Sequence, residues 1–421
     1  KVYWQDGAQI VPPHDINIIN EVNKIDSINK VLINNNNTNY ITYLNDDIDQ
    51  AYINKILEQF PPDDNILQNN NIKITYTPLH GTGAKLVPLT LSKLGFSNIT
   101  TVEQQMIPDG NFSTVKSPNP EEPEAFSMAI KIANQNNSEI IMATDPDADR
   151  IGIAIKDNNN NYILLNGNQT AAIIMQYLLS KRLNENKLNT QKDYIVTTIV
   201  TSSIIEKIAQ NFNIKCFNVL TGFKYIAEVI RNNENKLNFI AGCEESYGYL
   251  VGDFVRDKDA VISAAIIAQI TASLKQKGKS LYDFLIDIYL KYGLYKEKLI
   301  SLTKKGQDGI NQIKNMMSNY RLNPPSKIAG QKIIRIKDYL KQVDINTSNN
   351  TQTTIDLPVS DVLQFFLEDG TKISIRPSGT EPKIKYYFST SIPLKNEKEF
   401  NETNDKLDRK IEYIITDMNI I

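Results

Sequence analysis

The sequence predicts an α/β protein of several domains, and three observations lead to that prediction. The chain has 421 residues, too many for one hydrophobic core, so it is expected to divide into about three domains. Residues 40–165 alternate between helix and strand patterns, as units of strand, helix and parallel strand require. The last segment instead carries a hairpin-like pair of strands, 371–375 and 383–388.

Composition is that of an ordinary globular protein, with 41% hydrophobic and 22% charged residues. The formal net charge is −2, so no global field attracts nucleic acid or an acidic membrane surface. The longest apolar stretch, 260–274, is interrupted by polar residues and is shorter than the ~20 residues of a membrane span, which predicts a buried helix. Two cysteines are too few for a disulfide framework and fit a reducing compartment, which we expect to be the cytoplasm.

Residues 1–38 are typical of the end of a domain that began upstream. The chain starts at Lys1-Val2-Tyr3-Trp4 without a methionine, and this run predicts a strand. A turn at Asp6-Gly7 and a break at Pro12-Pro13 are expected next. Apolar residues at helical spacing then predict a helix over residues 16–33. We therefore expect the chain to be a fragment.

The patterns that follow place the elements in order. In the first α/β segment we predict a helix at 48–60, a strand at 72–76, a helix at 84–94 closed by Gly95 and a buried strand of a mostly parallel sheet at 139–144. The next segment predicts a helix at 169–179, a strand at 194–198, a helix at 203–211 and a strand at 239–241.

A glycine-rich turn, Thr77-Pro78-Leu79-His80-Gly81-Thr82-Gly83, joins the first of these strands to its helix. Glycines before a helix leave its first N–H groups free, and such a helix end attracts phosphate or carboxylate. The turn is not a dinucleotide fingerprint, because Leu86 stands where the third glycine is required. His80 is a candidate catalytic residue, although a hydrogen-bonded structural histidine is the simpler interpretation of this residue taken alone.

The most informative run is Asp145-Pro146-Asp147-Ala148-Asp149-Arg150, directly after the strand at 139–144. Open α/β sheets bind ligands at the carboxyl ends of their strands. Carboxylates at alternate positions would lie roughly 7 Å apart on a strand and would not face each other on a helix, so only a curled loop brings them together. A divalent cation is the simplest way to keep three clustered carboxylates ionised, and Mg²⁺ prefers such oxygen ligands.

The acidic run has two other interpretations. An EF-hand loop also begins with three alternating acids, but it requires glycine where Arg150 stands and glutamate where Lys156 stands. The run is therefore not an EF-hand. An acidic loop on a solvated surface remains the alternative to a metal site.

Two polar loops at later strand ends are candidate sites for sugar hydroxyls. They are Thr221-Gly222-Phe223-Lys224 and Gly242-Cys243-Glu244-Glu245-Ser246-Tyr247-Gly248. Adjacent acids, a hydroxyl and glycines supply the paired donors and acceptors that a sugar hydroxyl needs. A turn that caps a helix explains the second loop equally well.

The loop between the two C-terminal strands, Arg376-Pro377-Ser378-Gly379-Thr380-Glu381-Pro382, predicts a phosphate site. A planar guanidinium, two hydroxyls and a glycine N–H form a compact anion receptor. A simple turn would explain Pro-Ser-Gly, but it would not explain the preceding arginine and the two lysines that follow.

Together these motifs resemble the α-D-phosphohexomutase superfamily, in the branch of the phosphoglucomutases and phosphopentomutases, and the resemblance covers essentially the whole chain. It implies a phosphohexomutase-like α/β fold of related α/β domains with mixed sheets and a smaller C-terminal α+β domain built on an antiparallel sheet. The domains expected from the resemblance are a remnant of domain I at 1–38, domain II at 39–166, domain III at 167–292 and domain IV at 293–421.

The resemblance also implies roles for single residues. Magnesium would be held by Asp145, Asp147 and Asp149 together with a phosphoserine oxygen, and the sugar hydroxyls by Glu244 and Ser246. The remote phosphate would be held by Arg376, Ser378, Gly379 and Thr380. The candidate catalytic residues are Lys224, Lys1, His80 and Arg150.

The activity implied is the interconversion of glucose 1-phosphate and glucose 6-phosphate through a phosphoserine enzyme and a glucose 1,6-bisphosphate intermediate, with Mg²⁺. Phosphomannomutase and phosphopentomutase are the alternatives, and an inactive sugar-phosphate-binding protein is the alternative of another class. The family's nucleophile loop, Thr-x-Ser-His-Asn-Pro, does not occur in this sequence, so we expect the fragment to be inactive alone. The expected partner is a phosphorylated monosaccharide, with no nucleic acid and no membrane, and the protein is expected to be a monomer or homodimer.

Overall fold

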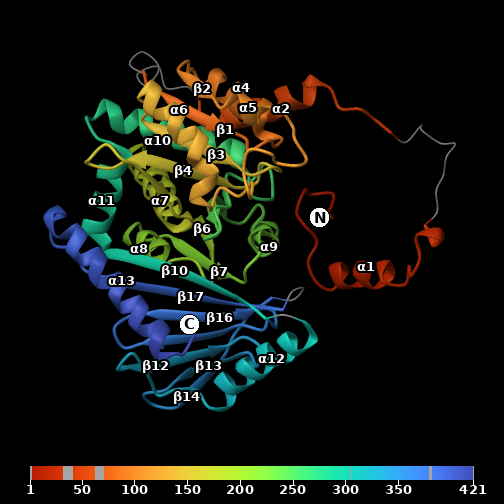
Figure 1. The fold of residues 1–421 in the computed structure, drawn as a ribbon, viewed down its shortest axis with the longest axis vertical. Coiled ribbons are helices and arrows are strands. Elements are labelled where there is room, and N and C mark those ends of the chain that lie inside the picture. The colour runs from red at the N-terminus through yellow and green to blue at the C-terminus, as the bar shows by residue number, and fades with distance from the viewer. Residues whose placement is uncertain (1, 32–40, 62–70, 305, 379–381, 421) are drawn as a thin grey trace. The chain divides into compact units, whose positions relative to one another are not determined.

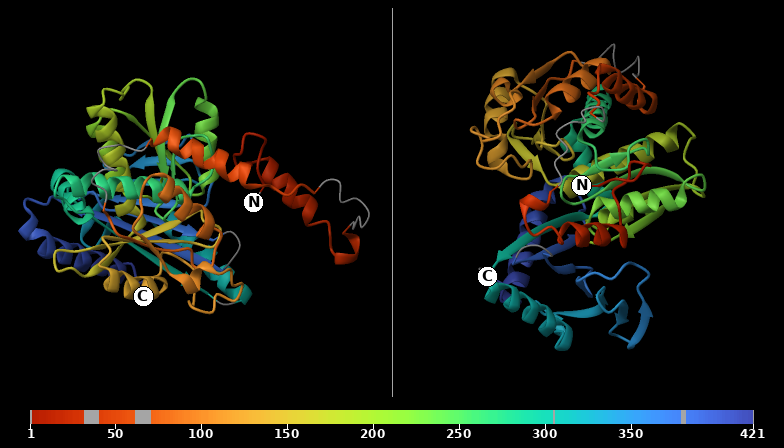
Figure 2. Two further views of the ribbon diagram at one scale, coloured as in Figure 1. Left: turned by 90° about the horizontal axis from the view of Figure 1, so that it is seen from above. Right: turned by 90° about the vertical axis from the view of Figure 1, so that its right-hand side faces the viewer.

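The computed structural model describes residues 2–31, 41–61, 71–304, 306–378 and 382–420 (Figures 1 and 2). The chain divides into two compact units. The first comprises Lys1–Thr197, Ala209–Phe217 and Thr221–Phe284, and the second comprises Thr198–Ile208, Asn218–Leu220 and Leu285–Ile421.

The first unit contains a mixed sheet with the strand order β2-β1-β3-β4-β5 (Figure 1). Its strands are β1 (Ile74–Thr77), β2 (Ile99–Thr101), β3 (Ile140–Thr144), β4 (Ile151–Lys156) and β5 (Tyr162–Leu165). β1 runs parallel to β2 and β3, whereas β4 runs antiparallel to β3 and β5 runs antiparallel to β4. The expectation of a mostly parallel sheet is therefore wrong at this edge, because the short loop from β3 to β4 turns the chain straight back, which only an antiparallel pair allows.

Helices cover this sheet and bury β3 completely. They are α4 (Gly83–Lys93), α5 (Glu103–Met106), η3 (Pro123–Phe126), α6 (Ser127–Asn136) and α10 (Ala260–Gln276). Ile141 and Ala143 of β3 belong to one buried cluster with Phe126 and Ala129, while α10 packs against α4 and β3. The predicted buried helix at 260–274 is confirmed by α10. No helix among the described residues is both long enough and apolar enough to cross a bilayer.

A second sheet has the strand order β7-β6-β8-β9. Its strands are β6 (Asp193–Thr198), β7 (Lys215–Val219), β8 (Asn238–Cys243) and β9 (Tyr249–Val251). The helices along this part of the chain are α7 (Gly167–Asn184), α8 (Ile204–Asn211), α9 (Phe223–Asn233) and α11 (Leu281–Tyr292). β6 runs parallel to β8, and β9 returns antiparallel along β8. The elements predicted at 169–179, 194–198, 203–211 and 239–241 are all present.

The N-terminal segment differs from its prediction. Within residues 2–4 there is only an isolated bridge from Tyr3 to Gln9, not a strand, although Gly7 forms the predicted turn with φ +78°. The helix predicted over 16–33 is α1 (His14–Val22), followed by a short turn of 3₁₀ helix, η1 (Ile28–Lys30). α1 buries none of its residues, so little packing is present to extend it. The next helix, α2 (Asp46–Gln59), agrees with the prediction and buries Ile53 and Ile56.

The second unit contains the predicted antiparallel sheet, with the order β10-β17-β16-β15-β12-β13-β14 and with β11 paired to β12. The strands are β10 (Leu294–Thr303), β11 (Lys327–Ile328), β12 (Gln331–Asp338), β13 (Val343–Asn346), β14 (Thr351–Thr354), β15 (Leu363–Leu367), β16 (Lys372–Pro377) and β17 (Lys383–Ile392). The helices α12 (Gly306–Leu322) and α13 (Phe400–Asp417) share one hydrophobic core with the sheet, in which Met317 and Ile414 join Phe365 and Ile375.

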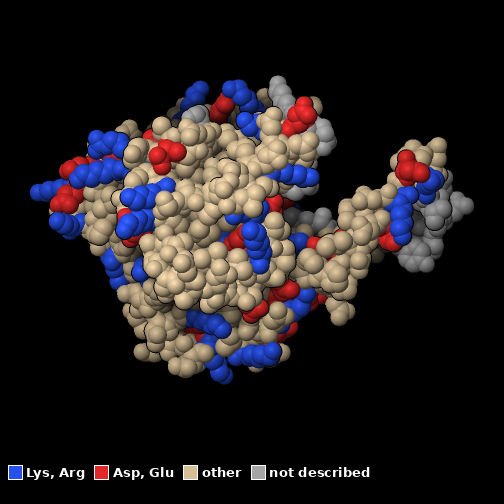
Figure 3. Space-filling model, turned by 90° about the horizontal axis from the view of Figure 1, so that it is seen from below, with Lys and Arg blue, Asp and Glu red and all other residues tan. Residues whose placement is uncertain are grey.

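Charges of both signs are present on the face drawn in Figure 3. On the face drawn in Figure 3, lysine and arginine side chains are interspersed with aspartate and glutamate side chains. This agrees with the formal net charge of −2.

Candidate metal centre and sugar-binding loop

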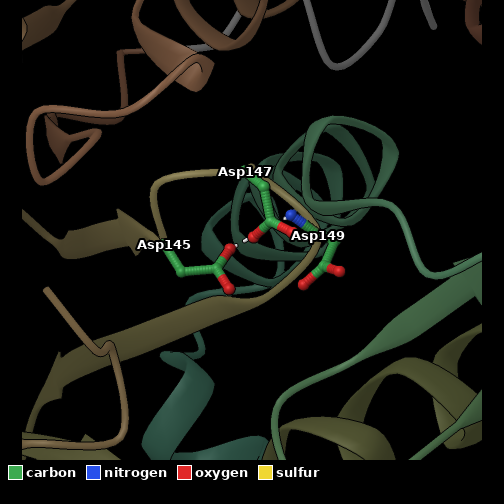
Figure 4. A group of neighbouring side chains, drawn as sticks. All are labelled: Asp145, Asp147 and Asp149. Carbon is green, nitrogen blue, oxygen red and sulfur yellow. Dashed lines mark hydrogen bonds between the residues drawn. The ribbon is translucent and has the colours of Figure 1, made fainter. Parts of the chain in front are cut away.

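The loop between β3 and β4 gathers the three aspartates of the acidic run. One carboxylate oxygen from each of Asp145, Asp147 and Asp149 lies within 4.8 Å of the other two. Figure 4 shows the three side chains projecting from the curled loop toward a common region. Asp145 is fully buried, Asp149 is half-buried and Asp147 is exposed, so the group opens to solvent on one side.

Backbone hydrogen bonds close this loop. The Asp145 Oδ1 atom accepts from the amides of Asp149 and Arg150 at 3.1 and 2.9 Å, and the Asp145 carbonyl accepts from the Ala148 amide at 2.9 Å. Ala148 adopts the left-handed conformation with φ +53°, where a small side chain is tolerated better than a branched one. The Ala148 carbonyl in turn accepts from the amide of Ala260, the first residue of α10. The loop is therefore fixed by its own hydrogen bonds between the two strands and by a hydrogen bond from the buried helix α10.

The electrostatics of the loop favour a bound cation. The pKa of Asp145 is raised to about 6, mainly by burial and also by the neighbouring charge of Asp149, while the hydrogen bonds and charge of Arg150 act in the opposite direction. The Arg150 Nε atom donates to Asp145 Oδ2 at 2.7 Å. Three converging carboxylates offer the negatively charged oxygen ligands that a hard cation such as Mg²⁺ prefers. The residues therefore fit that ion.

The glycine-rich turn at residues 77–83 supports the loop at residues 145–150, which we call the metal loop after its candidate ligands. A Cβ atom on Gly81 would lie 2.4 Å from Pro146 Cα, and one on Gly83 would lie 2.7 Å from the Thr144 hydroxyl. The Thr82 amide donates to the Pro146 carbonyl at 2.8 Å. The expectation of free N–H groups at this helix end is therefore wrong for Thr82, because its amide is already bonded to the metal loop.

His80 has both ring nitrogens engaged. Nδ1 lies 2.9 Å from the Ile107 carbonyl oxygen and must carry a proton to form that bond, and Nε2 lies 2.8 Å from the Thr114 hydroxyl. The ring is buried. This arrangement favours the structural interpretation of His80 over a catalytic one.

A cavity of about 580 Å³ adjoins the exposed side of the metal loop. It is lined by Asp147, Asp149, Tyr52 and Lys258, among others. The Lys258 ammonium lies 2.8 Å from Asp149 Oδ2. This volume is within the range of small-molecule sites.

Lys258 is a candidate functional residue that the sequence reasoning missed. It belongs to the charged run Arg256-Asp257-Lys258-Asp259, which separates β9 from the apolar helix α10. A concentration of charges between two buried elements was the available signal, because such a run must lie at a surface or line a site.

The loop at residues 244–248 packs against the metal loop within the same unit. Arg150 and Gly248 form an antiparallel bridge, and the Ile151 amide donates to the Tyr247 carbonyl at 3.1 Å. A Cβ atom on Gly167 would lie 2.0 Å from the Glu245 carbonyl oxygen, so this loop is pressed against the start of α7.

Glu244 lies at the base of this loop and is buried. Its carboxylate accepts from the Gly222 amide at 2.9 Å, which brings together the two loops predicted to bind sugar hydroxyls. The pKa of Glu244 is raised to about 7, mainly by burial and also by the charge of Glu245. Ser246 follows in the same loop and is half-buried.

The three basic residues predicted to be catalytic do not share one set of partners. The Lys224 ammonium pairs with Asp15 Oδ2 at 2.8 Å, within the first unit. Lys1 lies outside the described residues. Arg150, as described above, binds Asp145.

The predicted phosphate loop belongs to the second unit. Arg376 stands near the end of β16, directly across the sheet from Lys385 of β17. The Ser378 amide donates to the Lys383 carbonyl at 2.7 Å, which closes the base of the loop. Gly379 and Thr380 lie outside the described residues.

Two segments match known protein families. Residues 50–159 match the family described as phosphoglucomutase/phosphomannomutase, alpha/beta/alpha domain II. Residues 166–292 match alpha/beta/alpha domain III of the same description.

Individual relatives agree with these matches. The chain is 36% identical over 399 residues to a phosphoglucomutase of Staphylococcus haemolyticus, covering 93% of this chain and 70% of that protein. It is 35% identical over 417 residues to a phosphoglucomutase of Staphylococcus aureus, covering 98% of this chain and 72% of that protein.

Solved structures are similar in fold. The parafusin phosphoglucomutase of Paramecium, in its open form, superposes with a TM-score of 0.61 at 17% identity, covering 87% of this chain and 62% of that one. A phosphoglucomutase/phosphomannomutase family protein from Burkholderia thailandensis gives a TM-score of 0.55 at 14% identity, covering 87% and 64%. This chain thus spans less than two thirds of the length of these two structures.

Proposed function

Because the chain belongs to the phosphoglucomutase/phosphomannomutase family, we propose that it supplies the metal-, sugar- and phosphate-binding parts of a phosphoglucomutase. The reaction is the interconversion of glucose 1-phosphate and glucose 6-phosphate, an intramolecular phosphotransfer of the isomerase class. The observation that carries the proposal is the convergence of Asp145, Asp147 and Asp149 to within 4.8 Å beside a cavity of about 580 Å³.

The three aspartates would hold Mg²⁺, which when bound neutralises charge on a phosphoryl group during transfer. Arg150 keeps Asp145 in one orientation through its bond to Oδ2. Lys258 lies 2.8 Å from Asp149 at the wall of the cavity, and in this proposal it would contact the phosphoryl group or move a proton there. His80 supports the glycine-rich turn behind the loop rather than the chemistry.

The substrate would be held by two further loops. Glu244 and Ser246 offer an acid and a hydroxyl to the sugar, and the backbone bonds between their loop and the metal loop keep these groups at a fixed separation. Arg376 and Ser378, with Gly379 and Thr380, would bind the phosphate that does not react.

The phosphate donor in this proposal is a phosphoserine enzyme, with glucose 1,6-bisphosphate as the intermediate. The loop Thr-x-Ser-His-Asn-Pro does not occur in the 421 residues. We therefore assign the chain the parts of the reaction that bind metal and substrate, in domains at 39–166, 167–292 and 293–421.

The proposal is tested first by binding. We expect the 421-residue chain to bind glucose 1,6-bisphosphate in isothermal titration calorimetry, and Mg²⁺ to tighten that binding. Absence of any bisphosphate binding, with and without Mg²⁺, contradicts the proposed sites.

Turnover is tested in a protein whose chain continues upstream into the serine loop. We expect Mg²⁺-dependent conversion of glucose 1-phosphate in the presence of the bisphosphate. The ratio of kcat/KM for glucose, mannose and ribose 1-phosphates decides among phosphoglucomutase, phosphomannomutase and phosphopentomutase. Binding without turnover of any of these sugars would instead support an inactive sugar-phosphate-binding protein.

A further inference from the structure

A short turn before η3 carries an acid whose role the sequence motifs do not explain. The turn comprises Pro118-Asn119-Pro120-Glu121-Glu122. The Asn119 side-chain oxygen accepts from the Glu121 amide at 3.1 Å, and the Asn119 carbonyl accepts from the Glu122 amide at 3.0 Å. Asparagine commonly fixes a turn in this way. The direction in which Glu121 leaves the backbone is therefore determined by the turn, while the neighbouring Glu122 is exposed.

This turn lies against the strand that follows the metal loop. A Cβ atom on Gly152 of β4 would lie 2.5 Å from the Pro120 carbonyl oxygen. Real Cβ atoms do not approach so closely, so only glycine at this position lets the turn rest on the strand. The turn is thereby held beside Arg150, two residues earlier in the chain.

Arg150 connects the turn to the metal loop. Its Nη1 atom lies 3.0 Å from Glu121 Oε1, and its Nε atom lies 2.7 Å from Asp145 Oδ2. The same Nε atom is 3.8 Å from Asp149 Oδ1. A guanidinium has several donors in one plane, so it can hold two carboxylates at once, and its choice of partner depends on which acids surround it.

We propose that Glu121 is a positioning residue for the metal loop. Glu121 holds the Nη1 atom of Arg150, so that the Nε atom remains bonded to Asp145 and does not move to Asp149. Asp145 then keeps one carboxylate orientation, and the guanidinium does not compete with a cation for Asp149. This inference rests on the proposed metal site, and it adds a residue that does not itself contact the metal.

The test is direct Mn²⁺ binding to the 421-residue chain, measured by electron paramagnetic resonance of free Mn²⁺, which requires no turnover. Replacing a partner of a ligating group typically weakens metal affinity by about 10–100-fold. We expect Glu121→Gln to raise the Mn²⁺ dissociation constant by about tenfold. Glu122→Gln is the matched control, because it removes the same charge from the adjacent exposed position, and we expect less than about a twofold change from this screened charge.

A double-variant cycle separates positioning from general loss of structure. Lysine at position 150 lacks the fork that bridges two carboxylates. In an Arg150→Lys background, Glu121→Gln should therefore have no greater effect on Mn²⁺ affinity than Glu122→Gln. If Glu121→Gln does not fold, as judged by thermal unfolding, Glu121→Asp replaces it, because this change keeps the charge and withdraws the carboxylate from Arg150. It should also weaken binding.

The outcomes distinguish this inference from the proposed function. An unmodified chain that binds no Mn²⁺ overturns both. An unmodified chain that binds Mn²⁺ with equal affinity to the Glu121 variants overturns the positioning role alone. Equal weakening by Glu121→Gln and Glu122→Gln, or an undiminished Glu121 effect in the Arg150→Lys background, also overturns it.

Discussion

The close approach of Gly81 to the metal loop predicts that Gly81→Ala weakens metal binding. The new Cβ atom would lie 2.4 Å from Pro146 Cα and 2.6 Å from the Pro146 carbonyl oxygen. Non-bonded carbon atoms prefer about 3.5–4.0 Å, so the loop or the turn must move by about 1 Å. Both contacted atoms are backbone atoms, and no side-chain rotation can relieve them.

The size of the effect follows from the geometry of the metal. Ligand distances must lie within about 0.2 Å of their ideal values, so a displacement of about 1 Å at Pro146 disturbs the aspartates on either side. Overpacking of this kind also costs about 1–3 kcal/mol of stability. We expect Gly81→Ala to raise the Mn²⁺ dissociation constant of the chain by at least about tenfold, measured by electron paramagnetic resonance.

Gly110→Ala is the matched control. A Cβ atom there would have no neighbour within 4 Å, so it tests the intrinsic cost of replacing glycine by alanine in the same unit. Thermal unfolding of both variants reports the stability change separately. If Gly81→Ala binds Mn²⁺ as tightly as Gly110→Ala does, the turn does not set the position of the metal loop, and the argument from contact distances is refuted.

Three further predictions concern single side chains. Asp147→Ala should weaken Mn²⁺ binding by at least about tenfold while leaving the unfolding temperature nearly unchanged, because this ligand is exposed; near-normal binding would contradict its assignment. Arg376→Lys should weaken glucose 1,6-bisphosphate binding by about tenfold in calorimetry, because the bidentate fork is lost; an unchanged affinity would remove Arg376 from the phosphate site. Burial raises the pKa of Glu244 from 4.5 to about 7, so the folded state binds the proton more tightly than the unfolded state does. Up to about 3 kcal/mol of the free energy of unfolding is therefore lost as the pH rises from 4.5 through about 7. The unfolding temperature should therefore decrease less between about pH 5 and about pH 8 in Glu244→Gln than in the unmodified chain. An equal decrease in the variant and the unmodified chain would show that Glu244 is not buried as a carboxylic acid.

Much of the fold could be predicted from local sequence. The buried strand β3 and the helices α4 and α10 have strong apolar patterns that need no knowledge of distant partners. The convergence of the aspartates was also predictable, because their alternate spacing excludes regular structure and leaves only a curled loop. In each case the information lies within a few consecutive residues.

The features that were missed depend on contacts between distant parts of the chain. Lys258 reaches Asp149 only because α10 packs beside the metal loop, and Lys224 is paired with Asp15 from the N-terminal segment. The free helix end expected at the glycine-rich turn is replaced by a bond from Thr82 to Pro146. α1 is shorter than its apolar pattern indicated, since periodicity alone does not supply the packing that extends a helix.

The bridge between Arg150 and Gly248 has a consequence for how such proteins diversify. Lengthening or shortening the segment 244–248, which we propose binds the sugar, would displace the aspartates through this backbone connection and impair every substrate alike. Exchanging one side chain, such as Ser246, leaves the connection intact. Changes of sugar preference should therefore accumulate as substitutions at constant spacing, and insertions or deletions should be rare between residues 244 and 248.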